Sequence, residues 1–341
     1  MAATAIPRLK RVDCTGPGLK RRRRGRGFVY LDEEGERIDE GEVLQRIHEL
    51  VIPPGWEDVW ICPYPGGHIQ ATGIDQRGRK QYLYHPRWRA RRDAAKFDSM
   101  VAFAGRLPDL RTRVDEDLAR DDLSAAHVLA VAVRLLDRGF FRIGSEDYAV
   151  QNETYGLATM HKRHCRVRGD VLLFDYPAKH GKRRIQAVVD PEVAEVVERL
   201  KHRRGGSPEL LAYKEAGRWR DVKSADINAY LKDACHRDVS AKDFRTWGAT
   251  VLCAIALAVA EEPRSRTARK RQVTHAIKEV AYYLGNTPAV ARSSYIDPRV
   301  IDRYHDGETI EAALPDLAAA ESGTAIQGPV EQAVLDLLES A

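Results

Sequence analysis

DLSAAHVLAVAVRLLDRG, residues 122–139, sets the fold class of this chain. Its apolar residues recur at helical spacing, Ser124 precedes the first turn, and Gly139 stands just past the last. Serine side chains accept hydrogen bonds from the amides that begin a helix, and glycine tolerates the left-handed turn that ends one. The stretch therefore predicts a capped, buried helix, and helical periodicity of this kind dominates from about residue 96 onward.

Upstream of this helix, short runs alternate between apolar and polar residues and are separated by Pro-Pro-Gly, Pro-Gly-Gly and Gly-Arg-Gly turns. The runs are GFVYLD (27–32), DVWICPY (58–64), GHIQATGID (67–75) and QYLYH (81–85). Alternation with period two, bounded by turn residues, is typical of β-strands. Residues 27–95 are therefore expected to form a small β-rich domain.

Downstream, a further helix is expected to begin at Ser145, and one stretch interrupts the helical pattern. RVRGDVLLFDYPAKHGKRRIQAVVD, residues 166–190, alternates and carries turn residues near its middle. It predicts a small antiparallel sheet whose hairpin tip presents Lys179 and Lys182. The fold class is therefore α+β, with a small β-rich N-terminal domain and a mainly α-helical domain that contains a small antiparallel sheet.

The clearest helix begins at Ser240, with Asp243 three residues later as a variant of the capping box. Lys242 and Arg245 stand on the same side of its first turn. The amides and the dipole at a helix N-terminus favour an anion, and two cations there strengthen the preference for phosphate. A surface salt-bridge pair would explain the same two residues.

The distribution of charged residues along the chain indicates which kind of partner it binds. Residues 306–341 hold eight Asp and Glu and no Lys or Arg, so residues 1–305 carry +13 while the whole chain carries +5. Basic residues gather in residues 19–27, and in residues 77–92 they are interleaved with aromatic residues. Such mixing suits a phosphate backbone with rings against sugars or bases, although a solvated charged face remains an alternative.

Other classes of protein are disfavoured by what the sequence lacks. No stretch approaches the length of a membrane span, and the N-terminus has no signal-peptide pattern, so a cytoplasmic location is expected. Five cysteines without a C-x-x-C pair argue against a zinc site and a disulfide framework. There is no P-loop and no compact Asp/Glu cluster for Mg²⁺, so neither a cofactor nor a metal is expected.

Four short motifs follow one another along the chain: FFRIGSEDY, YPAKHGK, KDFRTWG and LGNTPAVARSSYI. In this order they resemble the motifs of type IB DNA topoisomerases, most closely the poxvirus-like and bacterial members. The segment IPPGWEDVWICPYPGGHIQATGIDQRGRKQYLYHPRW resembles their N-terminal DNA-clamping domain. The likeness covers nearly the whole chain.

The resemblance implies roles for individual residues. The family's catalytic arginines fall on Arg142 and Arg245, its general-acid lysine on Lys179 and its tyrosine nucleophile on Tyr295. Asn286 stands where poxvirus enzymes have a histidine, and the bacterial branch resembles this chain in having an asparagine there. An amide can donate a hydrogen bond to a phosphate oxygen without titrating near neutral pH. Lys182 is the second claimant for the role of general acid.

Candidate DNA contacts lie in the β-rich domain, at the tip of the predicted hairpin, and in the first turn of the helix that begins at Ser240. Those in the β-rich domain are Gln70, Arg77, Arg79, Lys80, Gln81, Tyr82 and Tyr84, and those in the helical domain are Lys182 and Lys242. Gln and Arg can read base edges in the major groove, and all of these residues can equally contact phosphates.

The resemblance implies an ATP-independent enzyme that relaxes supercoiled double-stranded DNA through a 3′-phosphotyrosine intermediate. It also implies a monomer that clamps the duplex, and no membrane partner is expected. The expected parts are a basic flexible segment (1–26), the DNA-clamping domain (27–95), the catalytic domain (96–305) and an acidic tail (306–341). The tail is expected to be solvated, with a short helix in PVEQAVLDLLES, or else to compete with DNA for the basic cleft.

Three alternative functions stay open: a tyrosine recombinase, a non-catalytic DNA-binding protein, and a catalytically impaired member of the family.

Overall fold

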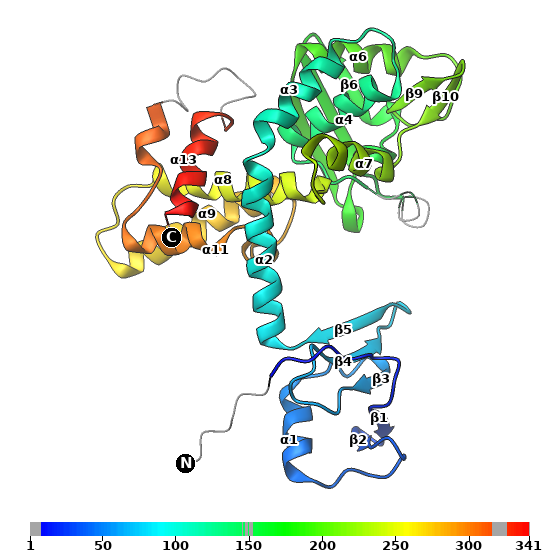
Figure 1. Ribbon diagram of the computed structural model, residues 1–341, viewed down its shortest axis with the longest axis vertical. Helices are drawn as coiled ribbons and strands as arrows, with labels where there is room; N and C mark the ends of the chain where they lie inside the picture. The colour runs from blue at the N-terminus through cyan, green and yellow to red at the C-terminus, as the bar shows by residue number, and fades with distance from the viewer. Residues whose placement is uncertain (1–7, 145, 147–148, 150–152, 316–325, 341) are drawn as a thin grey trace. The chain divides into compact units, whose positions relative to one another are not determined.

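The chain divides into two units, residues 1–96 and 97–341, and each is described here by itself. The computed structural model describes residues 8–144, 146, 149, 153–315 and 326–340, without the side chain of His180. Helix α2 (Pro86–Ala104) begins in the first unit and ends in the second (Figure 1). Within these described ranges, no helix is both long and apolar enough to cross a membrane.

The first unit contains a five-stranded antiparallel sheet, helix α1 (Gly41–Glu49) and the beginning of α2. Its strands follow the order β2-β1-β3-β4-β5 across the sheet (Figure 1). They are β1 (Leu19–Arg24), β2 (Gly27–Leu31), β3 (Glu57–Ile61), β4 (Ile69–Ile74) and β5 (Lys80–Tyr84). A small core of its own holds the unit together, made of Leu19, Ile47, Ile52, Val59, Ile61 and Ala71. The four strands predicted from sequence alternation correspond to β2, β3, β4 and β5.

Strand β1 corrects the expectation of a flexible basic segment before residue 27. LKRRRR forms a strand between β2 and β3, with Leu19 buried in the core. The guanidinium of Arg21 donates to the carbonyls of Pro53 and Trp56, at 3.0 and 2.7 Å, and lies over the ring of Phe28. The strand accommodates Arg21 because its guanidinium finds carbonyl acceptors and an aromatic face, whereas Arg22, Arg23 and Arg24 are exposed.

The second unit is mainly helical, as predicted, so the α+β class is confirmed. After α2 its helices are α3 (Leu107–Leu118), α4 (Ala125–Gly139), α6 (Pro191–His202), α7 (Ser224–Cys235), α8 (Ala241–Ala258), α9 (Arg266–Leu284), α10 (Pro288–Ser294), α11 (Pro298–Asp306) and α13 (Pro329–Glu339). Helices α4 and α8 are buried on nearly every side. Helices α9, α11 and α13 pack against α8, and α3, α6 and α7 pack against α4 (Figure 1).

Two small sheets complete the second unit. The predicted antiparallel sheet has the order β6-β7-β8, with β6 (Cys165–Arg168), β7 (Val171–Pro177) and β8 (Arg183–Val189). A two-stranded sheet, β9 (Ala212–Glu215) and β10 (Arg218–Asp221), was not predicted. Short 3₁₀ turns are η1 (Leu157–Thr159), η2 (Lys162–His164), η3 (Lys179–Gly181) and η4 (Glu311–Ala313). Phe141, just after α4, meets Phe174 of β7 edge to face, which joins the helix to the sheet.

The predicted helix caps are present where the structure describes them. Ser124 accepts from the backbone N–H of His127 at the start of α4. The backbone N–H of Ser240 donates to Asp243 at 2.8 Å, which is one half of the expected capping box of α8. The helix expected to begin at Ser145 falls largely on residues 145, 147–148 and 150–152, which lie outside the described residues.

The acidic end differs from the expected solvated tail. Helix α13 forms within PVEQAVLDLLES, as predicted, but Val330, Val334 and Leu338 lie in the core of the second unit. The helix docks because its apolar residues recur at helical spacing and form one buried face. Glu331 is also largely buried, with 9% of its surface exposed.

Candidate active site

Arg142 stands on a backbone segment that is held in place just after α4. The N–H of Leu157 donates to the carbonyl of Arg142 at 2.8 Å. Gly156 passes so close that a Cβ on it would lie 2.3 Å from the backbone nitrogen of Gly144. Only glycine fits such an approach, so the chain turns tightly here and fixes the position of the Arg142 backbone.

Asn286 lies next to Arg142 at the end of α9. Arg142 Nη2 donates to Asn286 Oδ1 and, at 3.3 Å, to the carbonyl of Gly285. Gly285 ends α9 with φ at +61°, a conformation that favours glycine. The Nδ2 atom of Asn286 is buried, and no described atom accepts its hydrogen bond. An unsatisfied buried donor is costly, so this amide fits a place that an oxygen acceptor, such as a phosphate oxygen, can occupy.

Arg245 is buried in the first turns of α8, with 3% of its surface exposed. Its Nη1 donates to the carbonyl of Phe140, and its Nη2 donates to the carbonyl of Leu284 at 2.9 Å. These bonds bring together the ends of α4, α8 and α9. Burial, with a contribution from the nearby Arg142, lowers the pKa of Arg245 to about 10, so the guanidinium remains charged at neutral pH.

Tyr295 follows α10 and faces these cations. The α10 helix is capped by Thr287, whose side chain accepts from the N–H of Val290. The ring centroid of Tyr295 lies 5.4 Å from Cζ of Arg245 and 6.0 Å from Nζ of Lys242. Burial acts to raise the pKa of the phenol, but the positive charges of Arg245, Arg142 and Lys242 outweigh it, and the pKa is lowered. The site therefore makes the phenolate, which is the nucleophilic form, easier to reach than it is for a tyrosine in water.

We expect the Lys242→Gln variant to raise the phenol pKa of Tyr295. A positive charge stabilises phenolate more than phenol, so removing the ammonium favours the protonated form. The measurement is a pH titration of ¹³Cζ-tyrosine by NMR, with the Tyr295→Phe variant to assign the resonance. A phenol pKa that stays unchanged or falls would show that Lys242 does not act on this ring.

The hairpin between β7 and β8 places both predicted lysines in one cleft with Arg142 and Asn286. Lys179 and Lys182 are exposed, and the hairpin is closed by a 2.8 Å bond from Ala178 N–H to the carbonyl of Lys182. The cleft has a volume of about 690 Å³ and is lined by Arg142, Lys179, Lys182, Arg183, Arg184 and Asn286 together with Tyr282 and Tyr283. It offers an anion several cations at once, as a phosphodiester requires.

Two residues that help to build the site were not predicted. Arg184 of β8 donates to the carbonyls of Tyr282 and Tyr283, which fixes the hairpin strand against the end of α9. Thr250 of α8 donates from Oγ1 to the carbonyl of Tyr295 at 3.3 Å and accepts from Asp297 N–H at 3.2 Å. Neither stands out in the sequence, because each acts through backbone groups that are far away along the chain.

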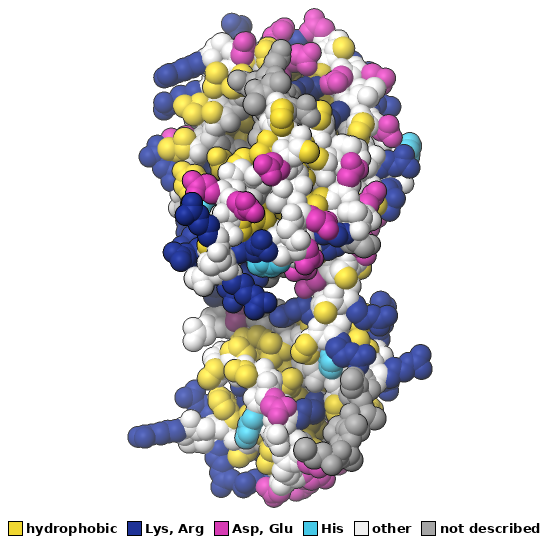
Figure 2. Space-filling model, turned by 90° about the vertical axis from the view of Figure 1, so that its left-hand side faces the viewer, with side chains coloured by type: hydrophobic (Ala, Val, Ile, Leu, Met, Phe, Trp, Pro, Cys, Tyr) yellow, Lys and Arg dark blue, Asp and Glu magenta, His cyan; other side chains and the backbone are white. Residues whose placement is uncertain are grey.

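The predicted DNA contacts of the first unit fall into three groups: the exposed face of β5, the turn before β5, and the buried residue Gln70. Strand β5 alternates in burial, so that Lys80, Tyr82 and Tyr84 share an exposed face. The rings of Tyr82 and Tyr84 are stacked, with centroids 6.1 Å apart. On the face drawn in Figure 2, Lys and Arg side chains project from both units. On the edge strand β5, the combination of Lys80 with Tyr82 and Tyr84 can contact phosphates and sugars.

The turn before β5 is organised by one carboxylate. Asp75 accepts from the guanidinium of Arg79 at 2.7 Å and from the side chain of Gln81 at 2.9 Å. The Arg79 side chain lowers the pKa of Asp75 to about 2, so the carboxylate stays charged. Arg77 remains exposed in the same turn. Arg79 and Gln81 are therefore partly engaged within the turn, whereas Arg77 and the β5 face present their side chains to solvent.

Gln70 differs from the prediction that it is exposed for contact with DNA. It has 3% of its surface exposed, and its Nε2 atom donates to the carbonyl of Gly67 at 2.7 Å and to that of Pro65 at 3.1 Å. Strand β4 is covered on both faces, so a polar residue within it points into the protein and is satisfied by backbone acceptors. Gln70 supports the turn that precedes β4 and does not present its amide to a ligand in this structure.

Comparisons with known proteins agree with this geometry. The family model described as the catalytic core of eukaryotic DNA topoisomerase I matches residues 85–319. The model described as the N-terminal domain of bacterial DNA topoisomerase IB matches residues 27–75. The first of these matches covers more than half of the chain.

Individual relatives are similar over most of their length. DNA topoisomerase 1B of Acanthamoeba polyphaga mimivirus is 26% identical over 295 residues, which cover 85% of this chain and 88% of the relative. DNA topoisomerase 1B of vaccinia virus (strain Copenhagen) is 22% identical over 69% of this chain and 72% of its own length. DNA topoisomerase 1 of rabbit fibroma virus is 23% identical over 84% of this chain and 92% of its own length.

These matches favour the topoisomerase over the tyrosine recombinase that the sequence left open, and they span both units of the structure. The chain belongs to the type IB DNA topoisomerase family.

Proposed function

We propose that this protein relaxes supercoiled duplex DNA without ATP, by cutting one strand through a 3′-phosphotyrosine intermediate on Tyr295. One observation carries the proposal. Arg142 and Arg245 lie beside the tyrosine, and within the described ranges neither forms an ion pair with a carboxylate. A buried arginine is ordinarily paired with an anion. Two guanidinium groups that no carboxylate of the described residues neutralises are suited to receive a phosphodiester.

The first step is attack by the tyrosine on phosphorus. The phenol of Tyr295 gives its proton to solvent, its oxygen forms a bond to phosphorus, and the bond from phosphorus to the 5′-oxygen breaks. Negative charge develops on the two nonbridging oxygens, where the forked donors of Arg142 and Arg245 can stabilise it. The free Nδ2 donor of Asn286 adds a neutral hydrogen bond to the same group.

The second requirement is a proton for the departing strand. A deoxyribose 5′-alkoxide is a much stronger base than a phenolate, so its departure needs a general acid. Lys179 is the proposed donor, and Lys182 on the same hairpin is the alternative. Both are exposed in the cleft, where a protonated ammonium can approach the 5′-oxygen.

The phosphotyrosine bond retains the free energy of the phosphodiester that was cut. The free 5′-hydroxyl end can rotate about the intact strand, driven by supercoil strain, and then attack phosphorus in the reverse reaction. The linking number changes and no nucleotide is consumed. The exposed β5 face of the first unit is proposed to contact the duplex through Lys80, Tyr82 and Tyr84, with the enzyme acting as a monomer.

We expect full relaxation of supercoiled plasmid in buffer that contains EDTA and no ATP. The positive charges that stabilise the transition state come from Arg142 and Arg245, so a chelator does not remove them. Magnesium is expected to speed turnover, because it competes with the protein for phosphates and releases the product. The measurement is the topoisomer distribution after deproteinisation, together with single-turnover cleavage of a labelled duplex.

Two results would contradict this expectation. Loss of single-turnover cleavage in EDTA would show that a metal takes part in the chemical step. A shift in plasmid mobility that disappears after deproteinisation, with no change in linking number, would identify a DNA-binding protein without activity.

A further inference from the structure

We propose that Glu331, on the C-terminal helix α13, is a positioning residue for Arg245. It joins α3, α4 and α8 so that the guanidinium of Arg245 stays beside Tyr295. The inference rests on the function proposed above, because it gives Glu331 a part in that reaction. The match to the catalytic-core family model ends at residue 319, so α13 lies beyond the segments that the two family models match.

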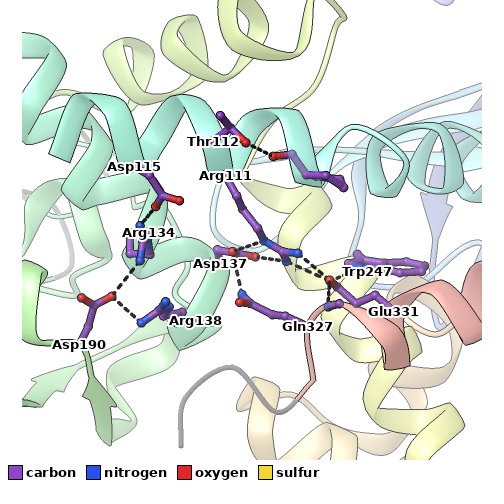
Figure 3. A network of polar contacts seen from close by, with 12 residues as sticks. Arg111, Thr112, Asp115, Arg134, Asp137, Arg138, Asp190, Trp247, Gln327 and Glu331 are labelled. Atoms are coloured by element: carbon purple, nitrogen blue, oxygen red, sulfur yellow. Dashed lines mark hydrogen bonds and ion pairs between the residues drawn. The ribbon is translucent and has the colours of Figure 1, made fainter. Parts of the chain in front are cut away.

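A network of charged groups surrounds Glu331 (Figure 3). Its carboxylate accepts from Arg111 Nη1 at 2.6 Å and from Arg111 Nη2 at 3.0 Å, which is a bidentate pair. The same guanidinium donates to Asp137 at 2.8 and 3.0 Å. Trp247 Nε1 donates to Glu331 Oε1 at 2.7 Å. One carboxylate from α13 therefore meets α3 through Arg111, and α8 through Trp247.

The C-terminal segment makes a second attachment to the same network. Gln327 Nε2 donates to Asp137 Oδ2 at 2.8 Å, and the N–H of Gly328 donates to Glu331 Oε2 at 3.2 Å. Burial alone would lower the pKa of Arg111, but Asp137 and Glu331 together raise it, so the guanidinium is firmly charged. A buried, fully paired network of this kind holds its partners in one arrangement.

The network holds both sides of a contact in the active site. Asp137 lies three residues before Phe140, whose carbonyl accepts from Arg245. Trp247 lies two residues after Arg245 on α8. Residues two apart on a helix point about 200° apart, so Trp247 and Arg245 face nearly opposite sides of α8. Glu331 and Arg111 therefore fix the outer side of α8 and the end of α4, while Arg245 joins the two elements on the inner side.

Removal of this link is expected to affect chemistry more than binding. If α8 shifts or rotates slightly, the guanidinium of Arg245 moves relative to Tyr295, and misplacement of a catalytic group is costly to the rate. DNA affinity depends on many other contacts and should change little. Loss of stability alone would change neither the cleavage rate of folded protein nor the phenol pKa of Tyr295.

The test compares full-length Glu331→Gln, Trp247→Phe and a matched control, Asp117→Asn. Asp117 is also a buried carboxylate of the second unit; among the described residues its hydrogen bonds go to Arg113, Arg120 and Tyr230, none of which lies on α8. Four quantities are measured: single-turnover cleavage rate, DNA dissociation constant, thermal unfolding midpoint, and the phenol pKa of Tyr295 from ¹³Cζ NMR.

The expected result separates the variants. Glu331→Gln slows cleavage by about tenfold, keeps the dissociation constant within about twofold and raises the phenol pKa of Tyr295. Trp247→Phe changes the same quantities in the same direction by less, because it removes only one hydrogen bond. Asp117→Asn lowers the unfolding midpoint but leaves the cleavage rate and the phenol pKa at their wild-type values.

Other results would overturn the proposal. It fails if Glu331→Gln lowers the unfolding midpoint and leaves both cleavage and phenol pKa unchanged, or if Asp117→Asn slows cleavage equally. If Glu331→Gln does not fold, an unchanged phenol pKa in Trp247→Phe is sufficient to reject it. If the wild-type enzyme forms no covalent adduct, the proposed function fails, while the phenol pKa still decides whether Glu331 positions Arg245.

Discussion

Replacing Tyr295 by phenylalanine abolishes covalent attachment to DNA and leaves DNA affinity within about twofold of the wild type. The substitution removes only the hydroxyl, and the ring can keep its place beside Arg245 and Lys242. Loss of a covalent nucleophile commonly reduces the rate by more than about 10⁴-fold, since no other group occupies its position. The measurements are adduct formation after denaturation in detergent, plasmid relaxation, and the dissociation constant for a duplex.

Tyr283→Phe is the matched control for this variant. Tyr283 lines the cleft beside Asn286 and is 54% exposed, but it has no proposed role in bond formation. It should form the adduct at close to the wild-type rate. An adduct that persists in Tyr295→Phe after denaturation would show that another residue is the nucleophile.

Replacing Lys179 by alanine slows cleavage of ordinary DNA by about 10²- to 10⁴-fold, the usual range for loss of a general acid. The 5′-alkoxide would then have to leave without a proton. A duplex with sulfur in place of the bridging 5′-oxygen removes this need, because a thiolate is a far weaker base than an alkoxide. Lys179→Ala should therefore recover most of its cleavage rate on the sulfur substrate.

Arg142→Ala and Arg245→Ala provide the contrast. If these arginines stabilise the nonbridging oxygens, sulfur at the bridging position does not replace them, and both variants stay slow. The measurement is single-turnover cleavage of matched oxygen and sulfur duplexes by each variant. The ratio of the two rates for each variant reports whether the missing side chain serves the leaving group.

Lys182→Ala decides between the two hairpin lysines. Rescue of Lys182→Ala by sulfur, with no rescue of Lys179→Ala, would assign the acid to Lys182. Rescue of neither would show that the hairpin only grips phosphate and that the proton comes from another group or from water.

Local sequence patterns predicted much of the fold because they depend on neighbouring residues. The alternation in QYLYH gave strand β5, and Ser240 with Asp243 marked the start of α8. The short helix predicted within PVEQAVLDLLES is α13, but its docking in the core through Val330, Val334 and Leu338 was not predicted. Capping, turn chemistry and periodicity are properties of short segments, so one sequence is enough to reveal them.

Burial of polar residues was harder to predict from the same patterns. Gln70 and Arg21 belong to residue types that are mostly exposed, yet both are satisfied by backbone carbonyls from other parts of the first unit. Whether such acceptors are available depends on the sheet being assembled. The basic run that makes up most of β1 was therefore mistaken for a flexible segment.

The candidate site shows the same division. The family motifs predicted Arg142, Lys179, Asn286 and Tyr295 as site residues. In the structure the first three line one cleft, and the positive charge of Arg142 contributes to the lowered pKa of Tyr295. The supporting residues act across long separations: Arg111 and Glu331 are 220 residues apart in the chain. A pair of this kind leaves no local pattern, so only the folded chain reveals it.

The central claim is that Tyr295 becomes joined to the 3′ end of the cut strand. The most direct measurement is mass spectrometry of the DNA-linked peptide, after the wild-type enzyme is trapped on a duplex, denatured and digested with protease. We predict one modified peptide, with a phosphate ester on the hydroxyl of Tyr295 that carries the 3′ end of the DNA. Attachment at any other residue, or attachment of a 5′ end, would contradict the account.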